Sequence, residues 1–217
     1  MAKANLITLS DPRSSATEAY RTLRTNLMFS SVENPIHTLL VTSPAKDDQK
    51  SITLANLAVT FAQGGNKTIL VDADLRQPKQ HDIWGLSNQR GLTTMMTDDT
   101  AISNPPLNST DVENLQIITS GELPPNPADL LGGKRMSEII GVLKARADFI
   151  LFDSPPVLAA TDAALLGIKL DGALLAIRAG DTRRDHTAQA REALERIHVR
   201  IVGAVLTNAP HENKIAY

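Results

Sequence analysis

The chain has 217 residues, a formal net charge of −2, and 42% hydrophobic and 21% charged residues. This balance excludes intrinsic disorder, and the near-neutral charge gives no support for binding nucleic acid. The absence of cysteine excludes disulfides, thiolate metal sites and a cysteine nucleophile. The sequence shows no apolar run of about 18 residues, as a membrane span requires, and residues 1–10 lack a secretory-signal pattern. We therefore expect one soluble, cytoplasmic domain over residues 1–217.

Apolar periodicity predicts a helix near the start of the chain. Residues 15–18 have the spacing of a capping box, and Tyr20, Leu23 and Leu27 then recur at helical intervals. Glu18 and Arg21 fall on the other side of this helix. A charged face of this kind is typical of simple exposure to solvent, and the pattern alone does not separate that from a binding role.

The rest of the chain alternates short aliphatic runs with helical patterns. The runs predict strands at 38–42, 68–71, 149–152, 173–177 and 201–206, with a weaker candidate at 115–119. The helical patterns cover 50–63, 136–143, 162–168 and a segment that opens at 182–185. Residues 95–114 are polar and rich in proline and asparagine, which predicts a long surface excursion. Near-continuous aliphatic strands separated by helices indicate an α/β fold with a doubly wound, mostly parallel sheet and helices on both faces.

Polar clusters directly follow several of the predicted strands. They comprise residues 43–51, Asp72 with Asp74, and Asp153. In a sheet of this type, ligands bind beyond the carboxyl ends of the strands. Carboxylates there are well placed to hold Mg²⁺ and to polarise an attacking hydroxyl. Together the clusters favour a phosphate site.

The first cluster has the order of a phosphate-binding loop: strand, loop, Lys50-Ser51, helix. Such a loop points backbone N–H groups at phosphate oxygens, while its lysine and hydroxyl serve phosphate and Mg²⁺. The glycine positions of this motif are occupied here by Pro44 and Gln49, and Asp48 adds negative charge. Taken alone, the segment matches a surface loop before a helix better than a phosphate-binding loop.

Several segments, in order and correctly spaced, carry a resemblance to a known family. They are EAYRTLRTN (18–26), ILVDADLRQP (69–78), PPNP (124–127) with LL (130–131), and ILFDSPP (150–156). With them the chain resembles the bacterial tyrosine kinases that regulate capsule and exopolysaccharide synthesis, which are P-loop proteins related to the MinD and ParA ATPases. The resemblance runs from about Glu18 to Asn208. It implies a P-loop NTPase fold, with ATP and Mg²⁺ as cofactors.

The resemblance also assigns roles within the site. It implies a nucleotide site formed by Asp48, Gln49, Lys50, Ser51, Ile52, Asp153 and Asn208. Ser51, Asp74 and Asp153 would hold Mg²⁺. Asp72 would be the base for a tyrosine hydroxyl, with Asp74 and Lys50 as further catalytic residues.

In the family, the first helix packs subunits into a ring. Glu18, Arg21 and Arg24 match the motif responsible, so residues 1–32 are expected to form a helical oligomerisation segment. Residues 209–217 are expected to form a flexible tail, and Tyr217 is the phosphoacceptor candidate where the family usually has a tyrosine cluster. The resemblance further implies a separate membrane protein as activator, which would recruit the chain to the inner face of the membrane.

The unusual loop leaves alternatives open. The family's Walker A loop is glycine-rich, whereas Gln49 carries a Cβ where the backbone approaches phosphate and where glycine tolerates the conformation better. The first hypothesis is an ATP-dependent autokinase with a degenerate loop. The second is a nucleotide-binding-impaired scaffold of the same polysaccharide machinery. The third is a positioning ATPase like MinD or ParA, although their signature lysine falls at Ala45, one place from Lys46.

Overall fold

The computed structural model describes residues 5–30, 33–46 and 49–209, and a seven-stranded sheet forms its centre. The strand order is β3-β4-β2-β5-β1-β6-β7, and the pairings are parallel except that of β3 with β4. The strands are β1 (Thr38–Thr42), β2 (Thr68–Asp72), β3 (Asn108–Ser109), β4 (Leu115–Ile118), β5 (Phe149–Asp153), β6 (Gly172–Arg178) and β7 (Ile201–Thr207). The predicted fold class, α/β with a mostly parallel sheet, is confirmed.

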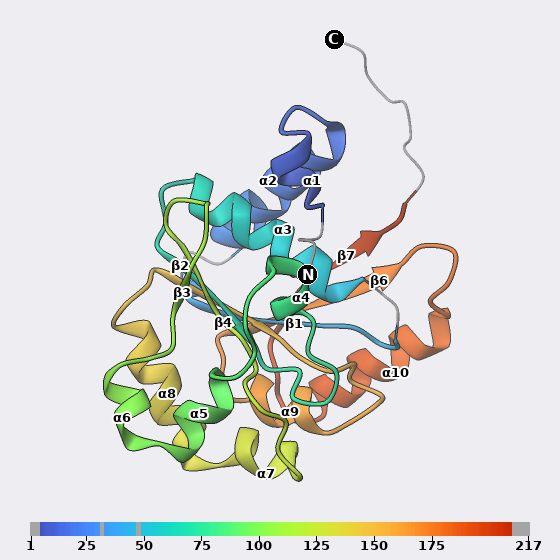
Figure 1. Ribbon diagram of the computed structural model, residues 1–217. Helices are drawn as coiled ribbons and strands as arrows, with labels where there is room; N and C mark the ends of the chain where they lie inside the picture. Colours follow the sequence, from blue (N-terminus) through green and yellow to red (C-terminus); the bar gives the residue numbers. More distant parts are fainter. Residues whose placement is uncertain (1–4, 31–32, 47–48, 210–217) are drawn as a thin grey trace.

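Helices cover both faces of the sheet (Figure 1). On one face lie α1 (Ile7–Ser10), α2 (Ser15–Phe29), α3 (Lys50–Gln63) and α4 (Gln80–Trp84). On the other lie α5 (Leu92–Thr97), α6 (Asp99–Ser103), α7 (Pro127–Gly132), α8 (Lys134–Lys144), α9 (Asp162–Gly167) and α10 (Arg184–Glu195). Two apolar cores result, one on each side of the strands.

Alternation along the central strand β1 divides its side chains between the two cores. Leu39 and Val41 pack with α3, whereas Leu40 packs with the helices of the opposite face. All three are fully or almost fully buried. Because successive side chains of a strand point to opposite faces, a strand covered on both sides needs an unbroken apolar run. This explains why the strand reads as a continuous aliphatic segment.

Two expectations about local structure were wrong. The polar stretch 95–114 contains the end of α5, all of α6 and strand β3, and its Met95 and Ala101 are buried in the core. Isolated apolar residues on short helices give too little periodicity to stand out against a polar background. Helix α2 is capped by Ser14, whose side chain accepts a hydrogen bond from Thr17 N at 3.2 Å, one residue before the predicted capping box.

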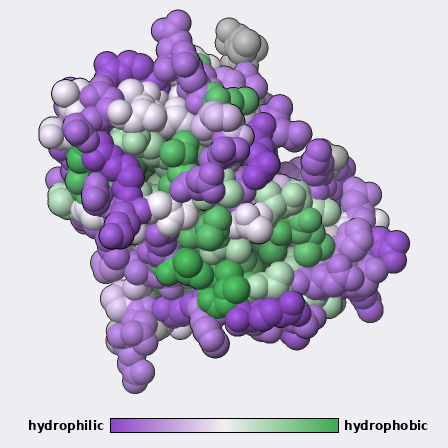
Figure 2. Space-filling model, turned by 90° about the horizontal axis from the view of Figure 1, so that it is seen from below, coloured by the Kyte–Doolittle hydropathy of each residue, from purple (hydrophilic) through white to green (hydrophobic). Residues whose placement is uncertain are grey.

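The surface carries an apolar area on the side of α7, α9 and α10, bordered by polar side chains (Figure 2). Leu158, Ile168 and Ile197 are among the exposed large apolar residues of the chain. None of the three lines the pocket described below. Within the described residues, no helix combines the length and the apolar character that crossing a membrane requires.

Candidate active site

The sheet brings the predicted polar clusters to one edge. Strand β5 lies between β2 and β1, and Asp72 and Asp153, the last residues of β2 and β5, are register partners. Strand β1 ends at Thr42, beside them, and leads into the loop before α3. The clusters therefore meet where the parallel strands end, as predicted.

The start of α3 carries backbone donors that the helix itself leaves without a partner. Gln49 precedes the helix with φ 58° and ψ 24°, the left-handed conformation that glycine adopts most easily. The first intrahelical hydrogen bond there runs from Thr53 N to Gln49 O at 2.9 Å, and the Gln49 side chain makes no capping hydrogen bond. The N–H groups of residues 50–52 thus have no partner within the helix, as an anion site requires.

Lys50 links the start of α3 to the strand ends. Its Nζ lies 2.9 Å from Asp74 Oδ2 and 2.9 Å from Asp153 Oδ1, and 3.4 Å from Ser51 Oγ. Burial alone would lower the pKa of Lys50, but the negative charges of Asp153 and Asp74 outweigh burial and raise the pKa above its usual range. Lys50 is therefore a buried cation that neutralises two carboxylates.

Asp72 lies beneath this ion pair and is completely buried. Its Oδ2 accepts hydrogen bonds from Lys79 N at 3.0 Å and Gln80 N at 2.8 Å, and its Oδ1 accepts one from Asp74 N at 3.2 Å. Burial, and then the charge of Asp153, raise the pKa of Asp72 to about 8, against the opposing hydrogen bond from Gln80. Burial and the neighbouring charge of Asp153 thus favour the neutral form of the Asp72 carboxyl over its ionised form.

A pocket of about 370 Å³ opens above Lys50. It is lined by Ser43, Ala45, Lys46, Gln49, Lys50, Ser51, Ile52, Asp74, Gln77, Lys79, Asp82, Ile83 and Pro156. Asp74 is on its wall, whereas Asp72 and Asp153 lie behind it. The pocket therefore joins the helix N-terminus, three lysines and two carboxylates, Asp74 and Asp82, and the lysines suit it to a phosphate chain.

A second pocket of about 530 Å³ lies between α2 and β7. Tyr20, Leu206 and Asn208 line it, and Gln49 lines both pockets. Asn208 has φ 51° and directly follows β7. The predicted nucleotide residue Asn208 is thus near the loop, but in a different pocket from Lys50.

The donor set around Lys50 fits Mg²⁺ only in part. Among the described residues, no three His, Cys, Asp or Glu side chains are arranged to hold a metal ion. Ser51, Asp74 and Asp153 all lie around the Lys50 ammonium group. A protein usually binds Mg²⁺ through one or two carboxylates together with phosphate oxygens, so this set suits a metal that arrives with a nucleotide.

The residues matched to the ring motif are not part of either arrangement. Glu18 and Arg21 form an exposed ion pair on α2. Arg24 donates from Nη1 to Thr60 O at 2.8 Å, in the last turn of α3, and therefore joins the two helices. Asp48 and Tyr217 lie outside the described residues, as do residues 210–217 of the predicted tail.

Two further contacts in the site were not predicted from the sequence. The guanidinium of Arg76 makes two hydrogen bonds of 2.9 Å with the buried carboxylate of Asp162, which joins the segment after β2 to α9. Gln80 donates from Nε2 to Asp153 Oδ2 at 2.8 Å. Arg76 belongs to a segment that carried the family resemblance, but a single glutamine in a polar stretch gives no recognisable signal.

Comparisons with known proteins place this geometry in a family. No family model matches the sequence. The chain is 40% identical over 202 residues to tyrosine-protein kinase YwqD of Bacillus subtilis strain 168, across 93% of this chain and 85% of YwqD. The solved kinase domain of the Escherichia coli tyrosine kinase ETK superposes with a TM-score of 0.91 at 30% identity, covering 100% of this chain and 85% of that domain.

The fold extends to more distant ATPases. The septum site-determining protein MinD from Pyrococcus horikoshii, solved with Mg-ADP, gives a TM-score of 0.66 at 23% identity, over 78% of this chain and 69% of MinD. At this identity the likeness shows a common fold alone. The identity to YwqD over most of both chains, together with the likeness to the ETK kinase domain, shows that the protein belongs to the family of bacterial tyrosine-protein kinases.

Proposed function

We propose that this chain is an ATP-dependent protein-tyrosine autokinase that regulates capsule or exopolysaccharide synthesis and export. One observation carries the proposal: the Lys50 ammonium group stands at the start of α3, which Gln49 does not cap, 2.9 Å from the carboxylates of both Asp74 and Asp153. A lysine, a free helix N-terminus and two carboxylates at one point are the groups that phosphoryl transfer needs.

Each group has a proposed role. The N–H groups of residues 50–52 bind phosphate oxygens, and Lys50 turns from its carboxylates to neutralise phosphate charge. Ser51, Asp74 and Asp153 would hold Mg²⁺, which when bound supplies charge neutralisation between the phosphates. The nucleotide extends past Gln49, which lines both pockets, so that its base meets Asn208.

The proposed base is Asp72. A base works best when its pKa lies near the working pH, and the pKa of Asp72 is raised to about 8. Once the side chains that cover it move aside, the ionised form of Asp72 would take the proton from the tyrosine hydroxyl. The hydroxyl oxygen attacks the γ-phosphorus, and the bond to the β-phosphate oxygen breaks and releases ADP. Asp74 lines the pocket, and we propose that it binds the metal beside Asp72. In Asp72→Asn the transfer rate should fall about 100-fold with little change in ATP affinity, whereas Asp74→Asn should raise the Mg²⁺ concentration needed for activity and lower the rate.

The proposed acceptor is Tyr217. The sequence holds two tyrosines, and the other, Tyr20, is half-buried on α2, in the pocket beside β7. We further propose that copies of the chain form a ring through Glu18, Arg21 and Arg24 of the 1–32 segment. In this arrangement the tail 209–217 of one copy would serve the site of its neighbour. A separate membrane protein would activate the chain and hold it at the cytoplasmic face of the membrane.

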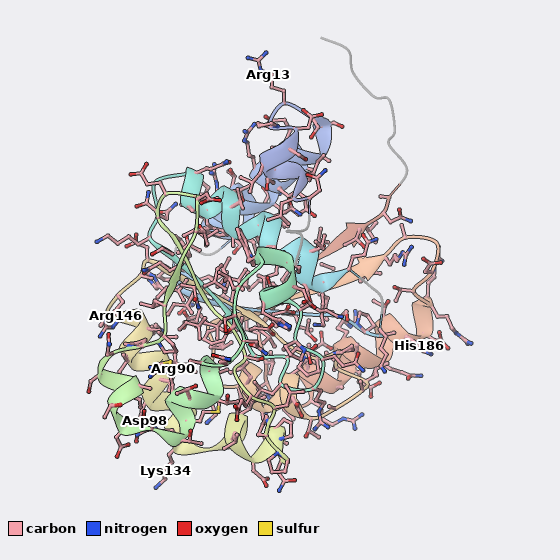
Figure 3. All side chains as sticks on the ribbon, in the orientation of Figure 1. Arg13, Arg90, Asp98, Lys134, Arg146 and His186 are labelled. Atoms are coloured by element: carbon pink, nitrogen blue, oxygen red, sulfur yellow. The ribbon has the colours of Figure 1, made fainter. Side chains whose placement is uncertain are left out.

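The experiment is phosphorylation of the purified chain with ATP and Mg²⁺, followed by mass spectrometry. Tyr217→Phe should abolish the phosphotyrosine signal, and Tyr20→Phe should leave it. Lys50→Met should also abolish it, with Lys134→Met as matched control, because the Lys134 side chain is exposed and points away from the body of the molecule (Figure 3). Phosphotyrosine that survives Lys50→Met would contradict the proposal.

A scaffold without turnover is the second candidate. The observation that favours it is the positive φ of Gln49, a strained conformation for a residue with a Cβ. A scaffold would keep the fold and assemble, yet show no saturable binding of ATP. The third candidate, a positioning ATPase, would hydrolyse ATP without any phosphotyrosine product.

A further inference from the structure

Gln80 is a polar side chain with no exposed surface, at the first position of α4. Its Nε2 donates to Asp153 Oδ2 at 2.8 Å and to Ser51 O at 3.1 Å. Its Oε1 accepts a hydrogen bond from Trp84 Nε1 at 3.2 Å. An amide buried without partners would be costly, and here both donors and the acceptor are used.

The backbone of Gln80 reaches the remaining element of the site. Its N–H donates to Asp72 Oδ2 at 2.8 Å. One residue thus contacts the end of β2 through Asp72, the end of β5 through Asp153 and the first turn of α3 through Ser51. These are the elements that carry the proposed catalytic and metal-binding groups.

The two oxygens of the Asp153 carboxylate have different partners. Oδ1 faces Lys50 Nζ at 2.9 Å, and Oδ2 faces the amide of Gln80. Once Lys50 turns toward phosphate, Gln80 is the side chain among the described residues that still fixes this carboxylate. Gln80 itself does not line the pocket, so a bound nucleotide does not touch it.

We propose that Gln80 is a positioning residue, which fixes the Asp153 carboxylate relative to the first turn of α3. Through its hydrogen bond to Trp84, a change in the partners of Asp153 should alter the surroundings of the indole. This inference rests on the proposed function. It adds a residue that acts through Asp153 and Ser51 and not by contact with the substrate. Partners of this kind commonly change activity by about 10-fold to 100-fold when removed.

Trp84 makes the proposal measurable without any substitution. It is the single tryptophan of the chain, and its side chain is buried with its N–H bonded to Gln80. When Lys50 leaves Asp153, the charge next to the Gln80 amide is no longer balanced by the lysine. The indole emission of Trp84 should therefore change in a saturable way as ADP and Mg²⁺ are added to the full chain.

The variants use side chains of similar length. Gln80→Met removes the donors and the acceptor, whereas Gln80→Glu places a carboxylate against Asp153. Gln189→Met, on the exposed surface of α10, is the matched control. For Gln80→Met we expect a fall in kcat of about tenfold or more, with nucleotide affinity changed less than about threefold, and a larger fall for Gln80→Glu. The control should match the unmodified chain.

Calorimetry with ADP and Mg²⁺, run beside the fluorescence titration, separates the outcomes. Calorimetric binding with a parallel emission change, which Gln80→Met loses while it still binds, supports the inference. Binding without an emission change, or an unchanged kcat in Gln80→Met, overturns the inference and leaves the proposed function standing. No binding by the unmodified chain would overturn both.

Discussion

Two groups of charged residues in this chain match family motifs, and they differ in how deeply they are buried. At the strand ends, Lys50, Asp72 and Asp153 are buried and held by several hydrogen bonds. On α2, Glu18 and Arg21 pair with each other in contact with solvent, with exposed side-chain fractions of 61% and 35%. Buried charges are costly unless their partners are well arranged, whereas exposed pairs contribute little.

This difference in burial decides which of the two groups can be assigned a function from the structure of one subunit. Burying the ion pairs at the strand ends costs desolvation free energy that apolar side chains would not cost, so a functional role is expected for them. The exposed charges on α2 have no such cost, so a role for them can be recognised only in an assembly of several subunits. Matched substitutions in the two regions should therefore have different effects.

The largest effect should follow loss of the buried cation. Lys50→Met leaves the carboxylates of Asp74 and Asp153 without their partner, which should lower the free energy of unfolding by about 3 kcal/mol at neutral pH. Arg21→Met, at the exposed pair, should lower it by less than about 0.5 kcal/mol. Urea unfolding of both variants without nucleotide measures the difference. Equal losses would show that the two regions do not differ.

The next effect concerns pH. Because the pKa of Asp72 is raised to about 8, the folded chain holds a proton that the unfolded chain releases above about pH 4. This contribution to stability is complete below the unfolded pKa and is lost as the pH rises to about 8. Unfolding of the nucleotide-free chain between about pH 5 and about pH 8 should show this decline, and Asp72→Asn should make it shallower. An unchanged slope would contradict the raised pKa.

A smaller effect is expected within α2 itself. Arg24 donates to Thr60 O and is half-buried, so Arg24→Met should lower the free energy of unfolding by about 1–2 kcal/mol. Arg21→Met should instead alter assembly with little change in monomer stability. Unfolding curves and light scattering on both variants distinguish the roles. If Arg21→Met leaves the size of the assembly unchanged, the proposed ring contact of Arg21 is wrong.

The smallest effect should come from the loop. Gln49 already adopts the left-handed conformation, so Gln49→Gly relieves a strain of about 1–2 kcal/mol. Part of this gain is offset because glycine loses more backbone entropy on folding. We expect the nucleotide dissociation constant to change less than about threefold. A much larger gain in affinity, measured by calorimetry, would show that the natural loop is impaired and would favour the scaffold.

Much of the fold could be predicted from the sequence because its strands are buried on both faces. Runs such as Thr38–Thr42 and Phe149–Asp153 allow few other structures. Short helices around a few buried side chains could not be predicted in this way. In α5 and α6 the apolar spacing of Leu92, Met95 and Met96 lasts a single turn, and only threonine and aspartate separate Met96 from the buried Ala101.

The site was partly predictable for a related reason. Lys50, Asp72 and Asp153 each adjoin a predicted strand or helix, so parallel topology alone places them at one edge. Gln80 and Asp162 depend on how the irregular segments after β2 and β5 fold back, which no local pattern encodes. Nor does spacing say that Asp72 lies behind the pocket while Asp74 lines it.

The most direct test of the central claim is a calorimetric titration of the purified chain with ATP and Mg²⁺. We expect saturable binding with a dissociation constant on the order of micromolar, lost in Lys50→Met and kept in Lys134→Met. Such a result would show that the start of α3 binds phosphate despite the left-handed Gln49. No binding by the unmodified chain at millimolar ATP would contradict the claim that this is a nucleotide site.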